Sequence, residues 1–97
     1  MYIVAIHDIR SETAFERGQA LINGVGAPEA TRVLQFYPAQ DGSRVSCLWE
    51  APSVDDVQRY VDTTLGDSSD NSCFAVDVEQ AFAERPLGLQ AAPQAVG

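Results

Sequence analysis

Lysine is absent from the 97-residue sequence, and its six basic residues, all of them arginine, face 14 aspartates and glutamates. The formal net charge is -8 at pH 7. Nucleic acids and anionic membranes attract proteins that carry a basic face. The shortage of positive charge therefore argues against both as partners of this acidic chain.

Cysteine and long hydrophobic runs are also scarce. The two cysteines, Cys47 and Cys73, form no CxxC pair and lack zinc-type spacing. No apolar run approaches the roughly 20 residues that a membrane-spanning helix needs. Residues 1–8 lack the basic region and cleavage site of a signal peptide. We therefore expect a cytoplasmic protein whose thiols are reduced.

Sequence motifs of the common nucleotide-binding and hydrolase sites are missing as well. There is no GxGxxG, no P-loop and no GxSxG. The length suits a single domain with one hydrophobic core. Any site must therefore be sought in how the fold arranges residues that are distant in the sequence.

The most informative stretch is residues 31–66. Two runs rich in β-branched and aromatic residues flank Asp41-Gly42, which tolerates positive φ and predicts a hairpin between strands at 31–37 and 44–51. Ser53 predicts a helix N-cap, and Gly66 is suited to end that helix. Between them, apolar side chains recur at helical spacing: Val54, Val57, Tyr60 or Val61, and Leu65.

The remaining segments complete a βαββαβ order. We expect a strand at 2–9, a helix at 13–23, a polar loop at 67–72, a strand at 73–79 and a helical turn at 80–85. This order predicts a ferredoxin-like α+β fold, with an antiparallel four-stranded sheet in the order 4-1-3-2 and two helices on one face. We assign residues 1–85 to this domain and residues 86–97 to a loosely ordered C-terminal tail.

Strand alternation separates the strand residues into two faces. We expect the helices to cover an almost wholly apolar set: Val4, Ile6, Leu34, Phe36, Val45, Cys47, Trp49, Phe74, Val76 and Val78. The other face would carry a mixed set: Ile3, Ala5, His7, Val33, Gln35, Tyr37, Ser46, Leu48, Glu50, Ala75 and Asp77. A half-apolar open face is typical of a partner surface. A second copy packing sheet to sheet would form a dimeric α/β barrel.

His7, the only histidine, is the leading candidate for chemistry. We expect Glu50 to end a strand that runs parallel beside that of His7, on the same face and at the same end, with Cys73 or Ala75 across from the histidine. Imidazole, carboxylate and thiol are ligands for nickel or zinc, so His7, Glu50 and Cys73 form a candidate metal set. The His7–Glu50 pair also suits a general base with its orienting group. The structural alternative is a hydrogen-bonded histidine at the edge of a dimer interface.

Tyr37 and Gln35 lie on the same predicted face and complete, with His7 and Glu50, a candidate ligand site in the cleft between two sheets. Cys47 alternates with Val45 and Trp49, which is typical of a core thiol.

Residues 41–57, DGSRVSCLWEAPSVDDV, resemble the Asp-Gly, Cys and Glu-Ala-Pro-Ser segment of a family of small actinobacterial-type domains of unknown function. One branch of that family is described as nickel-responsive or nickel-binding. The resemblance covers about a third of the chain and implies a ferredoxin-like fold, a homodimer and a nickel site. His7, Cys47 and Glu50 are the residues of suitable type. The chain is also similar, more broadly, to dimeric α/β-barrel proteins, which include small monooxygenases.

Three functions follow from these observations. The first is a homodimeric binding module that holds a divalent metal or small ligand between its sheets. The second is a small cofactor-independent enzyme, of monooxygenase or isomerase type, that uses His7 as base. The third is a structural dimer without further chemistry.

Overall fold

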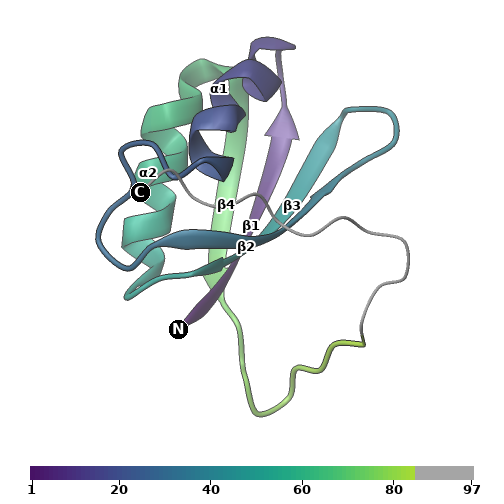
Figure 1. Ribbon diagram of the computed structural model, residues 1–97. Helices are drawn as coiled ribbons and strands as arrows, with labels where there is room; N and C mark the ends of the chain where they lie inside the picture. The colour runs from purple at the N-terminus through teal and green to yellow at the C-terminus, as the bar shows by residue number, and fades with distance from the viewer. Residues whose placement is uncertain (85–97) are drawn as a thin grey trace.

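The computed structural model describes residues 1–84 and contains the predicted succession of elements. They are β1 (Tyr2–Ile9), α1 (Thr13–Ile22), β2 (Arg32–Pro38), β3 (Arg44–Glu50), α2 (Val54–Leu65), the short 3-10 helix η1 (Gly66–Ser68) and β4 (Ser69–Ala75). Both helices lie on one face of the sheet (Figure 1). The ferredoxin-like α+β fold is confirmed, whereas the tail predicted at 86–97 lies outside the described residues. No helix within residues 1–84 is long and apolar enough to cross a bilayer.

The sheet has the order β2-β3-β1-β4, which is the predicted order read from the other edge. Every neighbouring pair of strands is antiparallel. The parallel course expected for β3 beside β1 is therefore wrong. The crossover connection through α1 makes β2 parallel to β1. The hairpin that follows reverses the chain, so β3 is antiparallel to both β2 and β1.

Local sequence signals account for the hairpin and for α2. Gly42 has a φ of 75°, as expected for the turn glycine, and the Asp41 carboxylate accepts hydrogen bonds from the backbone and hydroxyl of Ser43. Ser53 caps α2, because its Oγ accepts a hydrogen bond of 3.1 Å from the backbone of Asp56. Gly66 ends the helix with a φ of 56°. The apolar side of α2 then enters the core through Val57, Tyr60, Val61 and Leu65.

The two faces of β1 are the reverse of those expected. Ile3, Ala5 and His7 lie beneath the helices, while Val4 and Ile6 lie on the opposite face. Both sets are apolar enough to be buried, so alternation in β1 could not decide between them. The register decides, because directly paired residues share a face. Ile3 pairs with Trp49, Ala5 with Cys47 and His7 with Val45, and all three β3 partners are buried.

A bulge in β2 and the register of β4 determine on which face the side chains of these two strands lie. Val33 pairs with Trp49 and so joins the helix side, contrary to expectation, whereas Gln35 pairs with Leu48 after a register shift and lies on the open side as predicted. Phe74 pairs with Val4 and is 52% exposed, so its predicted place beneath the helices is wrong.

The last strand begins earlier than the sequence indicates. β4 starts at Ser69, within the segment expected to be a polar loop, because its backbone pairs with β1 from Ile9 to Ile3. Long-range pairing here overrides the weak strand preference of Ser, Asp and Asn. The chain then makes a turn in which Asp77 accepts hydrogen bonds from the backbones of Glu79, Gln80 and Ala81. Residues 81–84 have no regular structure, so within the described part the helical turn expected at 80–85 is wrong.

Candidate functional site

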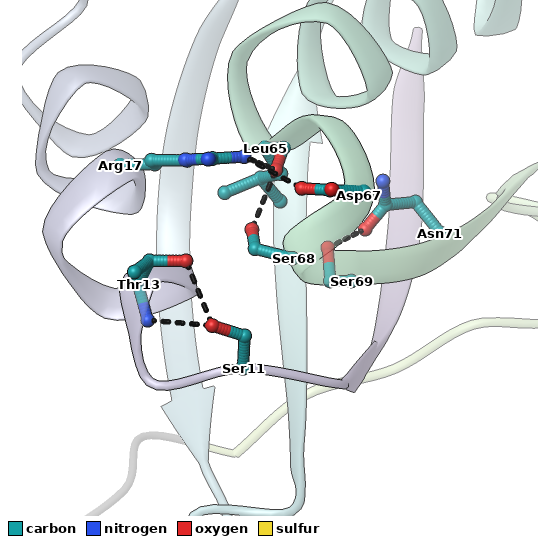
Figure 2. Close-up of polar contacts among 8 residues, drawn as sticks. All are labelled: Ser11, Thr13, Arg17, Leu65, Asp67, Ser68, Ser69 and Asn71. Carbon is teal, nitrogen blue, oxygen red and sulfur yellow. Dashed lines mark hydrogen bonds and ion pairs between the residues drawn. The ribbon is translucent and has the colours of Figure 1, made fainter.

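His7 occupies the helix side of a central strand and is only 3% exposed. Its Nδ1 lies 2.7 Å from Oδ1 of Asn71, the residue directly opposite it on β4. The amide of Asn71 is oriented by its other contacts, since Nδ2 donates to the Asp62 carboxylate at 2.9 Å and Oδ1 accepts from the Ser69 hydroxyl at 2.7 Å (Figure 2 shows the Ser69 contact). Asn71 Oδ1 can only accept, so Nδ1 of His7 carries a proton. In the neutral ring, Nε2 is then a hydrogen-bond acceptor.

The helix α2 holds Asn71 in place through two side chains one turn apart. Gln58 donates to the backbone carbonyl of Asn71 at 3.0 Å and to Asp62 at 3.1 Å, and its Oε1 accepts from the backbone of Cys73. These contacts tie the backbone of β4 to the helix on both sides of Ser72. The orientation of the His7 ring is therefore set by a chain of hydrogen bonds that reaches from β1 through β4 to α2.

The surroundings of His7 favour its neutral form. Burial lowers the pKa of His7 from its ordinary value, and the hydrogen bond to Asn71 and the charge of Asp62 oppose this only in part. At neutral pH the ring is consequently uncharged, with a lone pair on Nε2. Such a nitrogen can accept a hydrogen bond, take up a proton or ligate a metal.

The two thiols are poorly suited to ionic or nucleophilic roles. Burial, with the nearby Cys73, raises the pKa of Cys47 to about 12. Burial and the charge of Asp62 raise the pKa of Cys73 to about 11. A thiolate is the reactive and metal-binding form of cysteine, so burial disfavours that form of both side chains at neutral pH. The prediction that Cys47 is a core residue is confirmed.

A cavity of ≈ 50 Å³ lies between α1 and the sheet, and His7 is one of its lining residues. Most of the lining is apolar and comes from α1, β2 and β3. Trp49 also lines it, and Nε1 of this indole is buried without a hydrogen-bond partner among residues 1–84. Phe15 of α1 and Phe36 of β2 also line it, and each is about 40% exposed.

The structure separates the residues that the sequence analysis grouped into one site. His7 and Cys73 lie on the helix side of the sheet, whereas Glu50, Tyr37 and Gln35 lie on the open side. Glu50 is directly opposite Tyr2, at the far end of β1 from His7, because β1 and β3 are antiparallel. The expected pairing of His7 with Glu50 is therefore wrong. Cys73 is opposite Ala5 rather than His7.

The residues of the candidate metal set, His7, Glu50 and Cys73, therefore do not form one cluster. In the described part of the chain, no three His, Cys, Asp or Glu side chains are close enough to hold a metal ion together. Glu50 instead forms an ion pair of 3.2 Å with Arg32.

The open side of the sheet combines an apolar centre with paired charges at both ends. We call it the open face and define it by the register: Tyr2, Val4, Ile6, Asp8, Arg32, Gln35, Tyr37, Arg44, Ser46, Leu48, Glu50, Asp70, Ser72 and Phe74. Asp8 pairs with Arg44 at 3.2 Å, and Asp70 pairs with Arg10, just beyond β1, at 3.4 Å. The Arg32–Glu50 pair lies at the other end.

Sequence reasoning missed the residues that orient His7. Asn71 was expected in a loop, so its place opposite His7 could not be seen before β4 was known to begin at Ser69. Gln58 and Asp62 do carry a signal, because their spacing of four residues puts both on one side of α2. That signal alone does not say which strand they contact.

Comparisons with known proteins bear on the fold. No protein-family model matches the sequence, and no curated protein matches it. Among solved structures, the chain is similar to the crystal structure of SCO4226 from Streptomyces coelicolor A3(2), with 25% sequence identity and a TM-score of 0.57. The match covers 79% of this chain and 96% of that chain. The resemblance to a nickel-binding family stays a prediction.

Proposed function

We propose that this protein is a homodimeric module whose two copies associate through their open faces. The observation that carries the proposal is the charge balance of that face. Three arginines there or at its edge, Arg10, Arg32 and Arg44, are each paired with a carboxylate. Their charges cancel, so the chain's net charge of -8 comes entirely from the rest of the molecule.

This balance favours a second copy over a charged partner. Two chains of charge -8 repel each other over most of their surfaces. Together with Arg10 at its edge, the open face is electrically neutral, and it has an apolar centre of Val4, Ile6, Leu48 and Phe74, so it can be covered without bringing like charges together. An apolar centre within a polar rim is typical of protein interfaces. In a two-fold dimer, the arginines and carboxylates of each rim can also exchange partners across the interface.

A ligand site between the two sheets belongs to the same proposal. Gln35, Tyr37 and Glu50 lie on the open face, so sheet-to-sheet packing would enclose them. Native mass spectrometry of protein prepared without affinity-tag metal tests this extension. Extra mass on the dimer that corresponds to nickel, zinc or a small molecule supports a binding module, and a bare dimer limits the function to association.

The dimer itself is tested by changing the most exposed aromatic side chain of the open face. Phe74 is 52% exposed on β4, so a dimer that covers it removes ~100 Å² of its ~200 Å² surface from water. At ~25 cal/mol per Å², the loss in Phe74→Asp is ~2.5 kcal/mol per copy and ~5 kcal/mol per two-fold dimer. That weakens association by more than ~10³-fold.

The matched control is Val25→Asp, which adds the same charge at a side chain that is 56% exposed in the loop after α1. Sedimentation velocity over a concentration series should show wild type and Val25→Asp at twice the 10.5 kDa chain mass. Phe74→Asp should sediment at the chain mass with an unchanged circular dichroism spectrum. A monomeric wild type at ~100 μM, or equal association of the two variants, would overturn the proposal.

A further inference from the structure

Within residues 1–84 the sheet has two edge strands, β2 and β4, and they differ in how they resist the addition of another strand. An edge strand presents backbone N–H and C=O groups that can pair with a strand of another chain. In β2, the register shift after Val33 interrupts this row of groups, and Pro38 has no N–H to offer. β4 contains neither a bulge nor a proline, and its one charged residue, Asp70, is paired with Arg10. The sequence of β4 therefore does little by itself to prevent strand addition.

The hydrogen bonds to β1 show which backbone groups of β4 face the edge. The backbone N–H of Val76, just after β4, donates to the Tyr2 carbonyl, so the even-numbered residues of this segment are bonded to β1. In an antiparallel pair, alternate residues bond to the neighbouring strand and the others point away from it. The backbone groups of Asn71, Cys73 and Ala75 are therefore directed outward, at the edge of the sheet.

The side chain of Gln58, on α2, occupies two of these outward groups. Its Nε2 donates to the Asn71 carbonyl at 3.0 Å, and its Oε1 accepts from the Cys73 N–H at 3.1 Å. A residue of an added parallel strand makes the same two contacts, because its N–H and C=O bond to residues two apart on the neighbouring strand. Asp62 also accepts from Gln58 Nε2, at 3.1 Å, and so fixes which end of the amide faces Asn71. The carboxamide of Gln58 thus takes the place of a peptide group of a fifth strand.

A second copy of this chain is the partner that fits the edge when Gln58 does not occupy it. Antiparallel pairing centred on Cys73 sets this residue opposite its own copy and sets Asn71 opposite Ala75, so that each outward donor meets an acceptor. The charge of Asp70 is already balanced by Arg10, so β4 brings no unpaired charge to such a contact. The opposing factors are the Asp62 carboxylate and the net charge of -8, and salt screens both.

We propose that Gln58 closes the β4 edge of the sheet, and that without its amide a second copy of this chain adds to the sheet through β4. In the native protein, this closure leaves the open face as the surface of the sheet that associates. The inference does not depend on the open-face dimer, because the outward groups of β4 point along the sheet and not away from either face.

The test compares wild type with Gln58→Ala by sedimentation velocity over a concentration series, in about 1 M salt with a reductant present. At this ionic strength the Debye length is about 3 Å, so repulsion between the acidic chains is largely screened. Gln58→Ala should reach at least twice the mass of wild type, whether wild type is a monomer or a dimer. A monomeric wild type would contradict the open-face dimer and leave this comparison intact. The matched control is Gln19→Ala, the same change at an exposed position of α1, which should sediment as wild type does.

A second substitution, Ala75→Pro, shows whether the gained association uses the edge. Ala75 is exposed and its N–H points away from β1, so proline removes an outward donor without breaking the ladder between β1 and β4. Gln58→Ala combined with Ala75→Pro should return to the wild-type mass, which a merely destabilised protein would not do.

Hydrogen exchange at the Cys73 amide gives the local readout. In Gln58→Ala at the lowest concentration, this amide should exchange about fivefold faster than in wild type, since one hydrogen bond is lost. The exchange should slow again as the concentration rises and a second copy covers the edge. An unchanged mass in Gln58→Ala, or added mass that persists with Ala75→Pro, would overturn the proposal.

Discussion

The hydrogen bond between His7 and Asn71 provides the sharpest test of how the site is built. Asn71→Ala leaves the Nδ1–H of His7 without a partner at a position where the residue is 3% exposed, which costs about 1–3 kcal/mol. The change also removes the acceptor of the buried Ser69 hydroxyl, worth about 1 kcal/mol. We therefore expect a loss of about 2–4 kcal/mol in the free energy of unfolding. For a domain of this size, that corresponds to a fall in Tm of about 10–20 °C.

Chemical denaturation followed by Trp49 fluorescence measures this loss. Ser72→Ala is the matched control, because Ser72 is the next residue of β4 but is exposed and points to the open face. It should cost no more than about 0.5 kcal/mol. If Asn71→Ala and Ser72→Ala differ by less than that amount, the amide of Asn71 does not satisfy a buried group and the described relay is incorrect.

A double-mutant cycle isolates the pairwise contribution of His7. In a His7→Leu background there is no imidazole N–H to satisfy. The loss of unfolding free energy caused by Asn71→Ala should therefore be smaller than in wild type, by at least about 1 kcal/mol. The difference between the two backgrounds reports the hydrogen bond itself. Additive effects would mean that Asn71 stabilises β4 independently of the histidine.

Other predictions concern pH and backbone conformation. Because burial lowers the pKa of His7, the unfolded chain binds the proton more readily, so the contribution of His7 to stability is complete above its ordinary value of 6.5 and falls as the pH drops below it towards the folded pKa. Thermal melts between pH 7.5 and 5 should show this loss in wild type, and a slope equally steep in His7→Leu would contradict it. Ser53→Ala should cost about 1 kcal/mol in urea denaturation because the backbone of Asp56 loses its cap, and an unchanged midpoint would refute the capping role. Gly66→Ala places a Cβ 2.9 Å from Arg17 Nη1 at a φ of 56°, whereas Gly26→Ala at a φ of 72° meets nothing within 4 Å. Gly26→Ala should cost about 1–2 kcal/mol if only the backbone is strained. Gly66→Ala should cost more for two reasons: its ψ of -133° lies outside the left-handed helical region, and Arg17 must release the Leu65 carbonyl and Asp67 (Figure 2). Equal losses would contradict both.

Features governed by neighbouring residues were predictable from the sequence. The Asp41-Gly42 turn, the Ser53 cap, the helical apolar side of α2 and the end of that helix at Gly66 all depend on contacts within a few positions. The order of elements follows from them, and the strand order follows from the short connections and right-handed crossovers of a βαββαβ chain. These interactions have the same outcome whatever the rest of the protein does.

The candidate site depended instead on pairing between distant strands. In β1 both alternating sets are apolar, and only the pairing of Ile3 with Trp49 shows that His7 is turned towards the helices. The direction of β3 then places Glu50 at the opposite end and on the opposite face. A shift of one residue in register exchanges the two faces of a strand, so alternation within β1 could not specify the surroundings of His7. The position of its partner Asn71 could not be predicted, because tertiary pairing extends β4 into a segment whose local sequence is typical of a loop.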